Sequence, residues 1–274
     1  MSIPYLDAHL HLQDDRLGPH LDGIVTELRR WGIGRWVVAG TRESDWETVA
    51  KLAERYPEVV PCYGLHPWFV ADRSEDWEAT LAGYLARPKA AAVGEIGLDK
   101  WIRDHRIEEQ EVIFRSQWRL AGRAGLPVVI HCLKAWGRLL EILRDEPQIG
   151  PGFLLHSFAG PAEMVKEFVA LGGYFSFSGY FLQERKAAVV ETFRRIPIDR
   201  ILIETDAPDM RLPEALETYP LTSATDEALN HPANLPVIYQ GLADALALPL
   251  EPFADRVAEN FERLFGFAAP PSRH

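Results

Sequence analysis

The chain has 274 residues, of which 47% are hydrophobic and 25% charged, and its formal net charge is −11. No stretch approaches the roughly 18 apolar residues that a membrane-spanning helix needs, and the acidic charge disfavours the broad basic surface that many nucleic-acid-binding proteins use. We therefore expect one large domain over residues 1–274 and no membrane association. Because no export signal is visible, we also expect a cytoplasmic location.

Short apolar runs alternate with longer segments of helical periodicity along the chain. Between the fourth and fifth runs, Phe114, Trp118 and Ala121 form a helical stripe that ends at Gly125. Eight strand-then-helix units in about 250 residues are typical of a TIM (β/α)8 barrel, with a doubly wound open sheet as the alternative. The predicted strands are residues 5–9, 36–39, 59–63, 91–95, 128–131, 153–156, 174–177 and 201–204.

The C-terminal part of the chain predicts two closing helices, at residues 235–247 and 252–265. A long segment at residues 208–232, rich in Pro, Thr, Ser and Glu, precedes them. Loops of this length inside compact domains are usually functional or disordered, so this segment is a candidate active-site loop. The only two cysteines, Cys62 and Cys132, lie in separate apolar runs, which predicts reduced core residues rather than a disulfide.

The sequence DAHLH ends the first predicted strand. Side chains alternate along a strand, so Asp7, His9 and His11 point to the same side. Two imidazoles can therefore reach one metal ion. An H-x-H pair alone is a weak signal, because two histidines can simply be polar residues at a strand end.

Four further candidate ligands lie at strand ends. Glu95, His131 and His156 follow the fourth, fifth and sixth runs, and Asp206 follows the eighth. In a parallel barrel the carboxyl ends of the strands lie on one face, where barrel enzymes build their active sites. For a single such residue, a buried polar group satisfied by hydrogen bonds is the commoner explanation. Six of them at corresponding positions favour a metal centre.

Charge supports this interpretation. Burying two carboxylates beside four imidazoles costs several kcal/mol unless a cation compensates, and the motifs contain no Lys or Arg. We therefore predict two divalent metal ions. Nitrogen and oxygen donors suit zinc best, with manganese, magnesium, iron or cobalt as alternatives.

Three catalytic residues are predicted near these ligands. Asp206 is placed to orient a water molecule or take its proton. His66, after the third run, suits contact with a substrate phosphate or protonation of a leaving group, or else it is a loop residue packed by its neighbours. Glu204 lies two residues before Asp206 and could orient a ligand, contact the substrate or form a structural pair, and Asp7 and Asp99 invite the same interpretation.

The motifs DxHxH, GLHP, GEIGLD, LPVVIHC, HSFxG, ETDAP and NFERLF together resemble the TatD family of metal-dependent hydrolases, within the amidohydrolase superfamily. The resemblance spans nearly the whole chain and implies a TIM barrel. It also implies that Glu95 is shared by two ions, with His9, His11 and Asp206 completing one ligand set and His131 and His156 the other. The activities it implies are chiefly metal-dependent DNase or phosphodiesterase chemistry.

The chain departs from the family pattern after ETDAP. Asp209 stands where the family usually has an aromatic residue, and residues 214–227 contain several acids and no Lys or Arg. The phosphate-binding cations expected of a DNase are therefore reduced to Lys134 and Arg211, which could equally be solvated charges.

Three functions follow from these observations. The first is a TatD-type phosphodiesterase or DNase that uses a metal-bound hydroxide as nucleophile, acting on a phosphodiester such as short single-stranded nucleic acid. The alternative is an amidohydrolase-type hydrolase of an ester, amide or lactam in a small anionic metabolite. The third is a non-catalytic metal-dependent binding protein, which an open coordination position for water would argue against. No protein partner is predicted.

Overall fold

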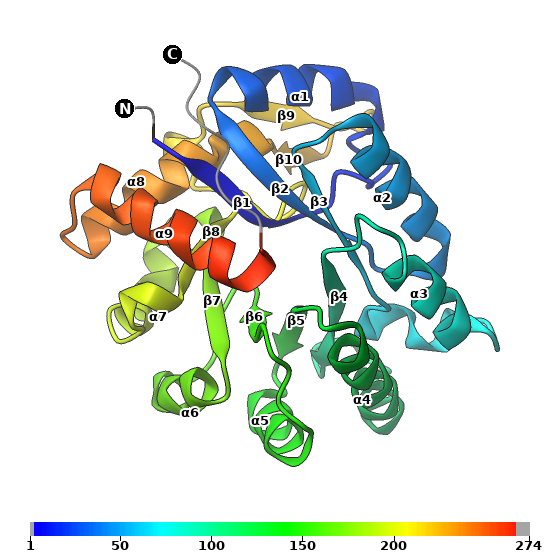
Figure 1. Cartoon of the computed structure of the whole chain (residues 1–274). Coiled ribbons are helices and arrows are strands. Elements are labelled where there is room, and N and C mark those ends of the chain that lie inside the picture. Colours follow the sequence, from blue (N-terminus) through cyan, green and yellow to red (C-terminus); the bar gives the residue numbers. More distant parts are fainter. Residues whose placement is uncertain (1–2, 267–274) are drawn as a thin grey trace. The chain divides into compact units, whose positions relative to one another are not determined.

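A computed structural model of the chain describes residues 3–266. Eight parallel strands form one sheet, in which neighbours follow chain order from β1 to β8 (Figure 1). The carboxyl end of β1 is also hydrogen-bonded to the segment after β8, because the Asp206 amide donates to the His9 carbonyl (2.9 Å) and the His11 amide to the Ala207 carbonyl (2.7 Å). Strands in chain order whose last returns to the first have the topology of a (β/α)8 barrel. The predicted fold class is confirmed.

The elements alternate as the sequence predicts. The strands are β1 (Tyr5–Leu10), β2 (Ile33–Ala39), β3 (Val59–Tyr63), β4 (Ala92–Asp99), β5 (Val128–Leu133), β6 (Phe153–Leu155), β7 (Gly173–Ser178), β8 (Ile201–Glu204), β9 (Pro220–Thr222) and β10 (Ala228–Asn230). The helices are α1 (Leu21–Arg30), α2 (Glu43–Arg55), α3 (Trp77–Leu85), α4 (Ile107–Ala124), α5 (Trp136–Asp145), α6 (Val165–Ala170), α7 (Ala187–Phe193), α8 (Leu235–Ala245) and α9 (Leu250–Phe265).

The chain divides into two compact units. Unit 1 comprises Met1–Val38 and Phe175–His274, and unit 2 comprises Ala39–Tyr174. Within unit 1, β1 pairs with β2 and β7 with β8; within unit 2, β3 to β6 pair in sequence, all parallel. That residues 1–274 form one domain stays a prediction.

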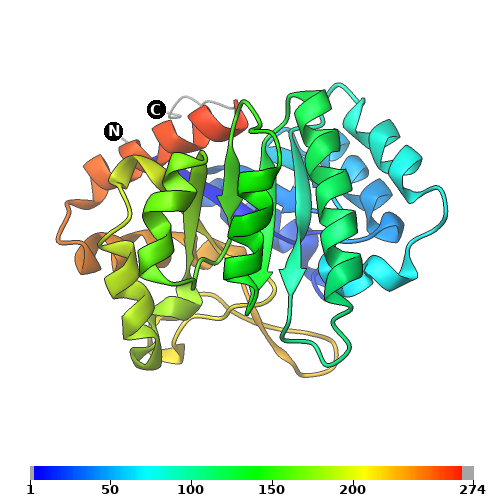
Figure 2. The ribbon, with the colours of Figure 1, turned by 90° about the horizontal axis from the view of Figure 1, so that it is seen from below.

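Helix α4 shows how the sequence pattern produces the layers of unit 2. Phe114, Trp118 and Ala121 are buried on one face of this helix, as predicted, and α4 packs along β4 (Figures 1 and 2). The helix ends at Gly125, whose φ of 68° is left-handed, a conformation that glycine adopts without steric cost. Burying this apolar stripe against β4 stabilises the layer.

A close approach between β4 and β5 requires glycine. A Cβ atom added at Gly97 would lie 1.9 Å from the carbonyl oxygen of His131, on the neighbouring strand. Gly97 therefore lets the two strands pair in register beside two of the predicted ligands.

The structure differs from the sequence prediction in detail. Strand β4 continues to Asp99, four residues past the predicted end, and β2 begins three residues earlier than predicted. The predicted loop at residues 208–232 contains a short antiparallel ribbon, in which β9 pairs with β10. This ribbon was missed because its strands have only three residues each, too few for a period-2 pattern. Within residues 3–266, no helix is long and apolar enough to cross a membrane.

Candidate metal centre

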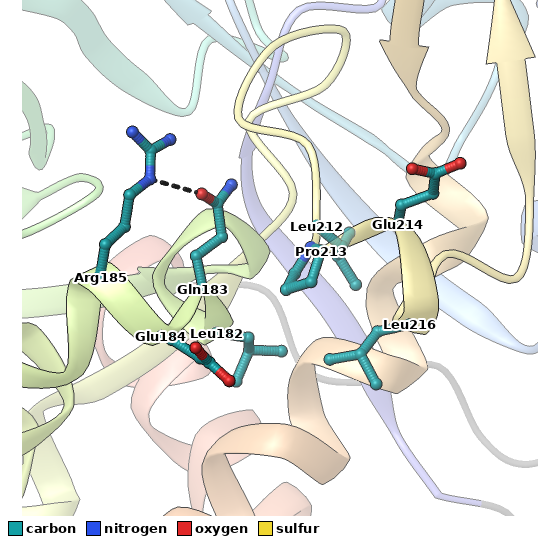
Figure 3. Close-up of a pocket in the computed structure, with 8 residues that line it drawn as sticks. All are labelled: Leu182, Gln183, Glu184, Arg185, Leu212, Pro213, Glu214 and Leu216. Atoms are coloured by element: carbon teal, nitrogen blue, oxygen red, sulfur yellow. Dashed lines mark hydrogen bonds between the residues drawn. The ribbon is translucent and has the colours of Figure 1, made fainter.

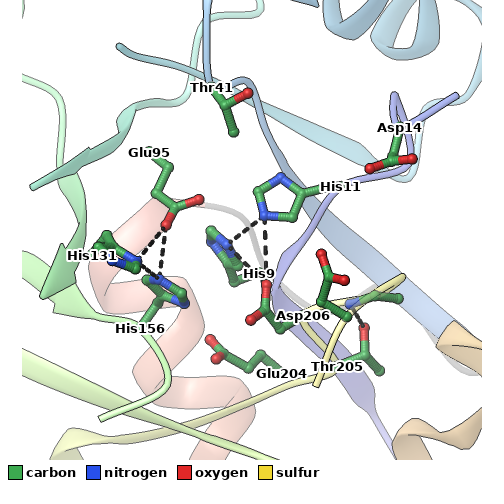
Figure 4. Close-up of polar contacts among 12 residues, drawn as sticks. His9, His11, Asp14, Thr41, Glu95, His131, His156, Glu204, Thr205 and Asp206 are labelled. Carbon is green, nitrogen blue, oxygen red and sulfur yellow. Dashed lines mark hydrogen bonds and ion pairs between the residues drawn. The ribbon is translucent and has the colours of Figure 1, made fainter. Parts of the chain in front are cut away.

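Unit 1 brings together three of the predicted ligands, His9, His11 and Asp206. The Nε2 atoms of His9 and His11 are 3.2 Å apart, and each lies 3.5 Å from Oδ1 of Asp206 (Figure 4). His9 is fully buried and Asp206 nearly so. Strand alternation places the two imidazoles on one side of the chain, and the hydrogen bonds between β1 and the segment after β8 bring Asp206 to them.

A buried carboxyl group anchors this arrangement. Asp7 accepts hydrogen bonds from Oγ1 (2.6 Å) and the amide (3.0 Å) of Thr205 and from the amide of His9 (3.3 Å). Burial raises the pKa of Asp7 to about 8, although these hydrogen bonds lower it. Asp7 thus ties the chain before Asp206 to the chain before His9.

Glu204 lies one residue before Thr205 and is completely buried. It accepts a short hydrogen bond from the Ser176 hydroxyl on β7. This burial favours an orienting role for Glu204 over direct contact with a substrate.

Unit 2 gathers a second cluster around one oxygen of Glu95. Oε1 of Glu95 lies 2.9 Å from Nε2 of His156, 3.2 Å from Nδ1 of His131 and 3.3 Å from Nε2 of His66. The facing nitrogens of His131 and His156 are 3.3 Å apart (Figure 4). Glu95, His66 and His156 are buried, and the His131 side chain is 11% exposed. The four side chains come from β4, from β5 and from the segments after β3 and β6.

Asp99 contacts the His131 ring on the side opposite Glu95. Its Oδ2 lies 2.9 Å from Nε2 of His131 and accepts a hydrogen bond from the Trp68 indole (2.6 Å), while Oδ1 accepts one from the Trp101 amide (2.5 Å). Burial by itself would raise the pKa of Asp99, but the hydrogen bonds from His131 and Trp68 lower it to about 2. Conversely, burial would lower the pKa of His131, and the bonds to Asp99 and Glu95 raise it above its usual value. Asp99 is therefore ionised at neutral pH.

His66 has a different environment. Its Nδ1 accepts a hydrogen bond from the Trp68 amide at 3.2 Å, while Nε2 faces Glu95. Burial lowers the pKa of His66 to about 4, although the nearby Glu95 carboxylate raises it. The ring is therefore neutral near pH 7, and because Nδ1 accepts, its proton lies on Nε2.

The altered segment after Asp206 is held by ion pairs within unit 1. Arg16 contacts Asp14 (2.9 Å), Asp209 (3.0 Å) and Glu227 (3.2 Å). Asp209, which replaces an aromatic residue of the family pattern, thus anchors the segment electrostatically. The sequence reasoning missed this role of Arg16, although an acidic residue in an aromatic position was a signal to look for a cation.

Arg211 is one of the two cations left as candidates by the sequence. It forms an ion pair with the nearly buried Glu217 at 2.6 Å. Its charge is therefore largely compensated within the loop, which leaves Lys134 as the stronger candidate for contact with an anionic substrate.

An open hollow of about 670 Å³ lies on unit 1 (Figure 3). Leu182 and Leu212 line it, together with Arg185, which donates to Gln183 (2.7 Å). None of the predicted ligands lines this hollow, so it is not part of the candidate centre.

The chain is similar to known proteins over nearly its whole length. Residues 6–266 match the family described as TatD related DNase. The chain belongs to this family. Membership makes it a metal-dependent hydrolase of the TatD type and an enzyme that acts on ester bonds.

Individual TatD relatives cover almost the whole chain. A protein of Escherichia fergusonii named 3'-5' ssDNA/RNA exonuclease TatD is 31% identical over 96% of this chain and 99% of its own length. A Bacillus subtilis protein named uncharacterized metal-dependent hydrolase YabD is 29% identical over 94% of this chain and 98% of its own. The crystal structure of YJJV, a TatD homologue from Escherichia coli, has a TM-score of 0.89 and 26% identity, covering 97% of this chain and 100% of its own.

Sequence reasoning missed Thr205 as the partner of Asp7. The signal was present, because a buried acid in the DAHLH motif needs a donor and Thr205 lies inside ETDAP. His231, outside the predicted site, caps a short helical turn, because its Nδ1 accepts a hydrogen bond from the Ala233 amide at 3.0 Å.

Proposed function

We propose that this TatD-family chain binds two divalent ions, most favourably zinc, and hydrolyses phosphodiester bonds in short single-stranded nucleic acid. His9, His11 and Asp206 would hold one ion in unit 1, and Glu95, His131 and His156 the other in unit 2. The observation that supports this most directly is the convergence of nitrogen and oxygen donors in each unit. The sharing of Glu95 by both ions, the preference for zinc and the cytoplasmic location stay predictions.

The spacing of the donor atoms fits bound ions. In a tetrahedral zinc site with metal–ligand bonds of about 2.0–2.1 Å, neighbouring ligands are about 3.3 Å apart. The donors of unit 1 are separated by 3.2–3.5 Å, and those from Glu95, His131 and His156 by 2.9–3.3 Å. The mixture of imidazole and carboxylate donors suits zinc and the neighbouring transition metals.

Hydrogen bonding separates ligands from supporting residues. His131 presents Nε2 to Asp99, so its Nδ1 is available to an ion. His66 accepts at Nδ1 and carries its proton on Nε2, so it has no lone pair for a metal while the Trp68 bond lasts. His66 is therefore proposed as a hydrogen-bond donor to Glu95 or to a substrate phosphate. With its pKa near 4, protonation of a leaving group is the weaker of its two predicted roles.

When bound, divalent ions lower the pKa of water and polarise a phosphoryl oxygen. Asp206 lies within 3.5 Å of both imidazoles and is 12% exposed at its side chain, so it can orient a water molecule and accept its proton. The hydrogen bonds between Asp7 and Thr205 hold the backbone immediately before this carboxylate.

Relatives indicate the substrate class, since the Escherichia fergusonii protein is named a single-stranded DNA/RNA exonuclease. The acidic segment after Asp206 and the Arg211–Glu217 pair offer few cations for a long duplex. These features favour a short single-stranded substrate. They also keep a small anionic ester, amide or lactam as the alternative substrate.

The test uses protein loaded with zinc or manganese and three substrate classes: 5′-labelled single-stranded DNA, bis(p-nitrophenyl) phosphate, and a panel of carboxylic esters, amides and lactams. Asp206→Asn should lower kcat on the phosphodiesters by about 10²–10⁴-fold. Asp209→Asn is the matched control, because Asp209 is 56% exposed and pairs with Arg16 rather than with the imidazoles.

Three results would argue against the proposal. Full activity in Asp206→Asn would show that the site is elsewhere. Hydrolysis of carboxylic esters or amides, with no hydrolysis of phosphodiesters, would show that the substrate belongs to the alternative class. Fewer than two ions per chain by elemental analysis would remove the two-metal assignment.

A further inference from the structure

The loops after β3 and β4 present two exposed tryptophans within unit 2. Trp101 is 65% exposed and Trp68 is 49% exposed, whereas aromatic side chains of this size are usually well buried. Both are held by hydrogen bonds to Asp99, from the Trp68 indole and from the Trp101 amide. The Trp68 indole and the Trp101 backbone are thus fixed at positions where core packing does not account for the exposed rings, so these rings are available to a ligand.

A cation lies on one of these rings. Nζ of Lys134 is 4.0 Å from the centroid of the Trp101 ring, and the lysine forms no ion pair with a carboxylate among residues 3–266. Its backbone has a φ of 56°, a left-handed conformation that is unfavourable for a residue with a Cβ atom. Strained residues of this kind concentrate at functional sites.

The local charge is opposite to that of the chain as a whole. Lys100 and Arg103 are exposed in the same loop as Trp101 and outnumber its one exposed acid, Asp104, while the chain has a net charge of −11. A small basic surface beside aromatic faces, on a protein that otherwise repels polyanions, fits a local contact with a few phosphates.

We propose that Trp101, Trp68 and Lys134 form a nucleotide platform, on which a base of a single-stranded nucleic acid stacks while Lys134 binds a neighbouring phosphate. This proposal rests on the proposed phosphodiesterase function and names the residues that would hold one nucleotide of its substrate. Every base offers a π-face to an indole, but in a duplex both faces are covered by neighbouring bases. The platform therefore selects single strands or frayed ends without reading sequence.

The platform is linked to the Glu95 cluster by one carboxylate. Asp99, which accepts from the Trp68 indole and the Trp101 amide, also faces His131 at 2.9 Å, and the Trp68 and His131 ring centroids are 6.4 Å apart. A base stacked on the platform thereby holds the adjoining backbone beside His131 and Glu95, where hydrolysis is proposed.

Binding is measured by fluorescence anisotropy with metal-loaded protein and a short labelled oligothymidylate whose phosphorothioate linkages resist hydrolysis. Trp101→Leu should raise Kd by about 5- to 150-fold, the effect of losing one stacked base, and Trp101→Phe should recover most of the affinity. Lys134→Gln should reduce the slope of log K against log salt by about 0.7. Two control variants should leave both the Kd and the salt slope unchanged. They are Trp31→Leu, at a 42% exposed tryptophan that caps the end of α1, and Lys51→Gln, at a lysine on α2 whose side chain is 71% exposed.

An abasic oligonucleotide of equal length distinguishes the loss of base stacking from a general disruption of the protein surface by the substitution. Its affinity should be the same for the wild type and Trp101→Leu; an equal loss on both oligonucleotides would overturn the platform. If the wild type hydrolyses phosphodiesters and Trp101→Leu binds oligothymidylate normally, the platform is wrong while the proposed function stands. If no phosphodiester is hydrolysed but binding still depends on Trp101 and Lys134, the function fails and the platform stands.

Discussion

Replacing Asp99 with asparagine tests whether this carboxylate orients His131 as a ligand. Asp99 accepts from the Trp68 indole, the Trp101 amide and Nε2 of His131 at 2.5–2.9 Å, and it is completely buried. An asparagine keeps one acceptor oxygen and turns the other into a donor. At least one of these bonds is therefore lost, and His131 meets at best a neutral amide oxygen, which holds its Nε2–H less strongly than a carboxylate does.

Such supporting residues typically contribute 10–100-fold to metal affinity, which corresponds to about 1.4–2.7 kcal/mol. We expect Asp99→Asn to weaken one of two zinc sites by this factor, measured by competition with a chromophoric chelator. Trp68→Phe removes one donor but keeps the carboxylate, and it should bind zinc like the wild type.

Asp145→Asn is the surface control, since that carboxylate is 67% exposed and pairs only weakly with Arg115 at 3.3 Å. Circular dichroism establishes that each variant is folded. Unchanged zinc affinity in folded Asp99→Asn would refute the assignment of Asp99 as the group that orients His131.

Two further tests probe the packing of unit 2 by urea unfolding. Gly97→Ala should destabilise the chain by about 1–3 kcal/mol, because its Cβ would meet the His131 carbonyl. Gly83→Ala is the control: it has open space in α3 and should stabilise the chain by up to about 1 kcal/mol. Equal effects of the two substitutions would contradict the close approach of β4 and β5. Burial alone would raise the pKa of Glu146, but its ion pairs with Arg119 and Arg115 lower it. These ion pairs therefore stabilise the fold fully above the unfolded pKa of about 4.3. The stabilisation is lost as the pH falls through the lower pKa of the folded state. Glu146→Gln should therefore cost about 1–3 kcal/mol at pH 7 and much less at pH 3, and a constant difference would show that charge is not the cause.

Local patterns in the sequence determined the eight strands, the fold class and the positions of six candidate ligands. Each ligand follows an apolar run, and strand alternation alone aligns His9 with His11. Family motifs then identified the class of enzyme, which the match over residues 6–266 confirmed. These features depend on short stretches of chain, so they can be predicted without the tertiary structure.

Side-chain partners distant in sequence were decided only by the tertiary structure. The sequence indicates that Asp7 needs a donor and Asp209 a cation, but it does not identify Thr205 and Arg16 as these partners, because the contacts arise only when the chain after β8 returns to β1. The tautomer of His66 depends on an amide in the following loop, and it separates a hydrogen-bond donor from a metal ligand. Lys134, one of two equivalent cations in the sequence, is distinguished by its place over the Trp101 ring, while Arg211 is neutralised by Glu217. Hydrogen bonds and ion pairs act over a few ångströms. The chemistry of each residue could therefore be assigned from the sequence, but the partner that its side chain faces was decided only by the fold.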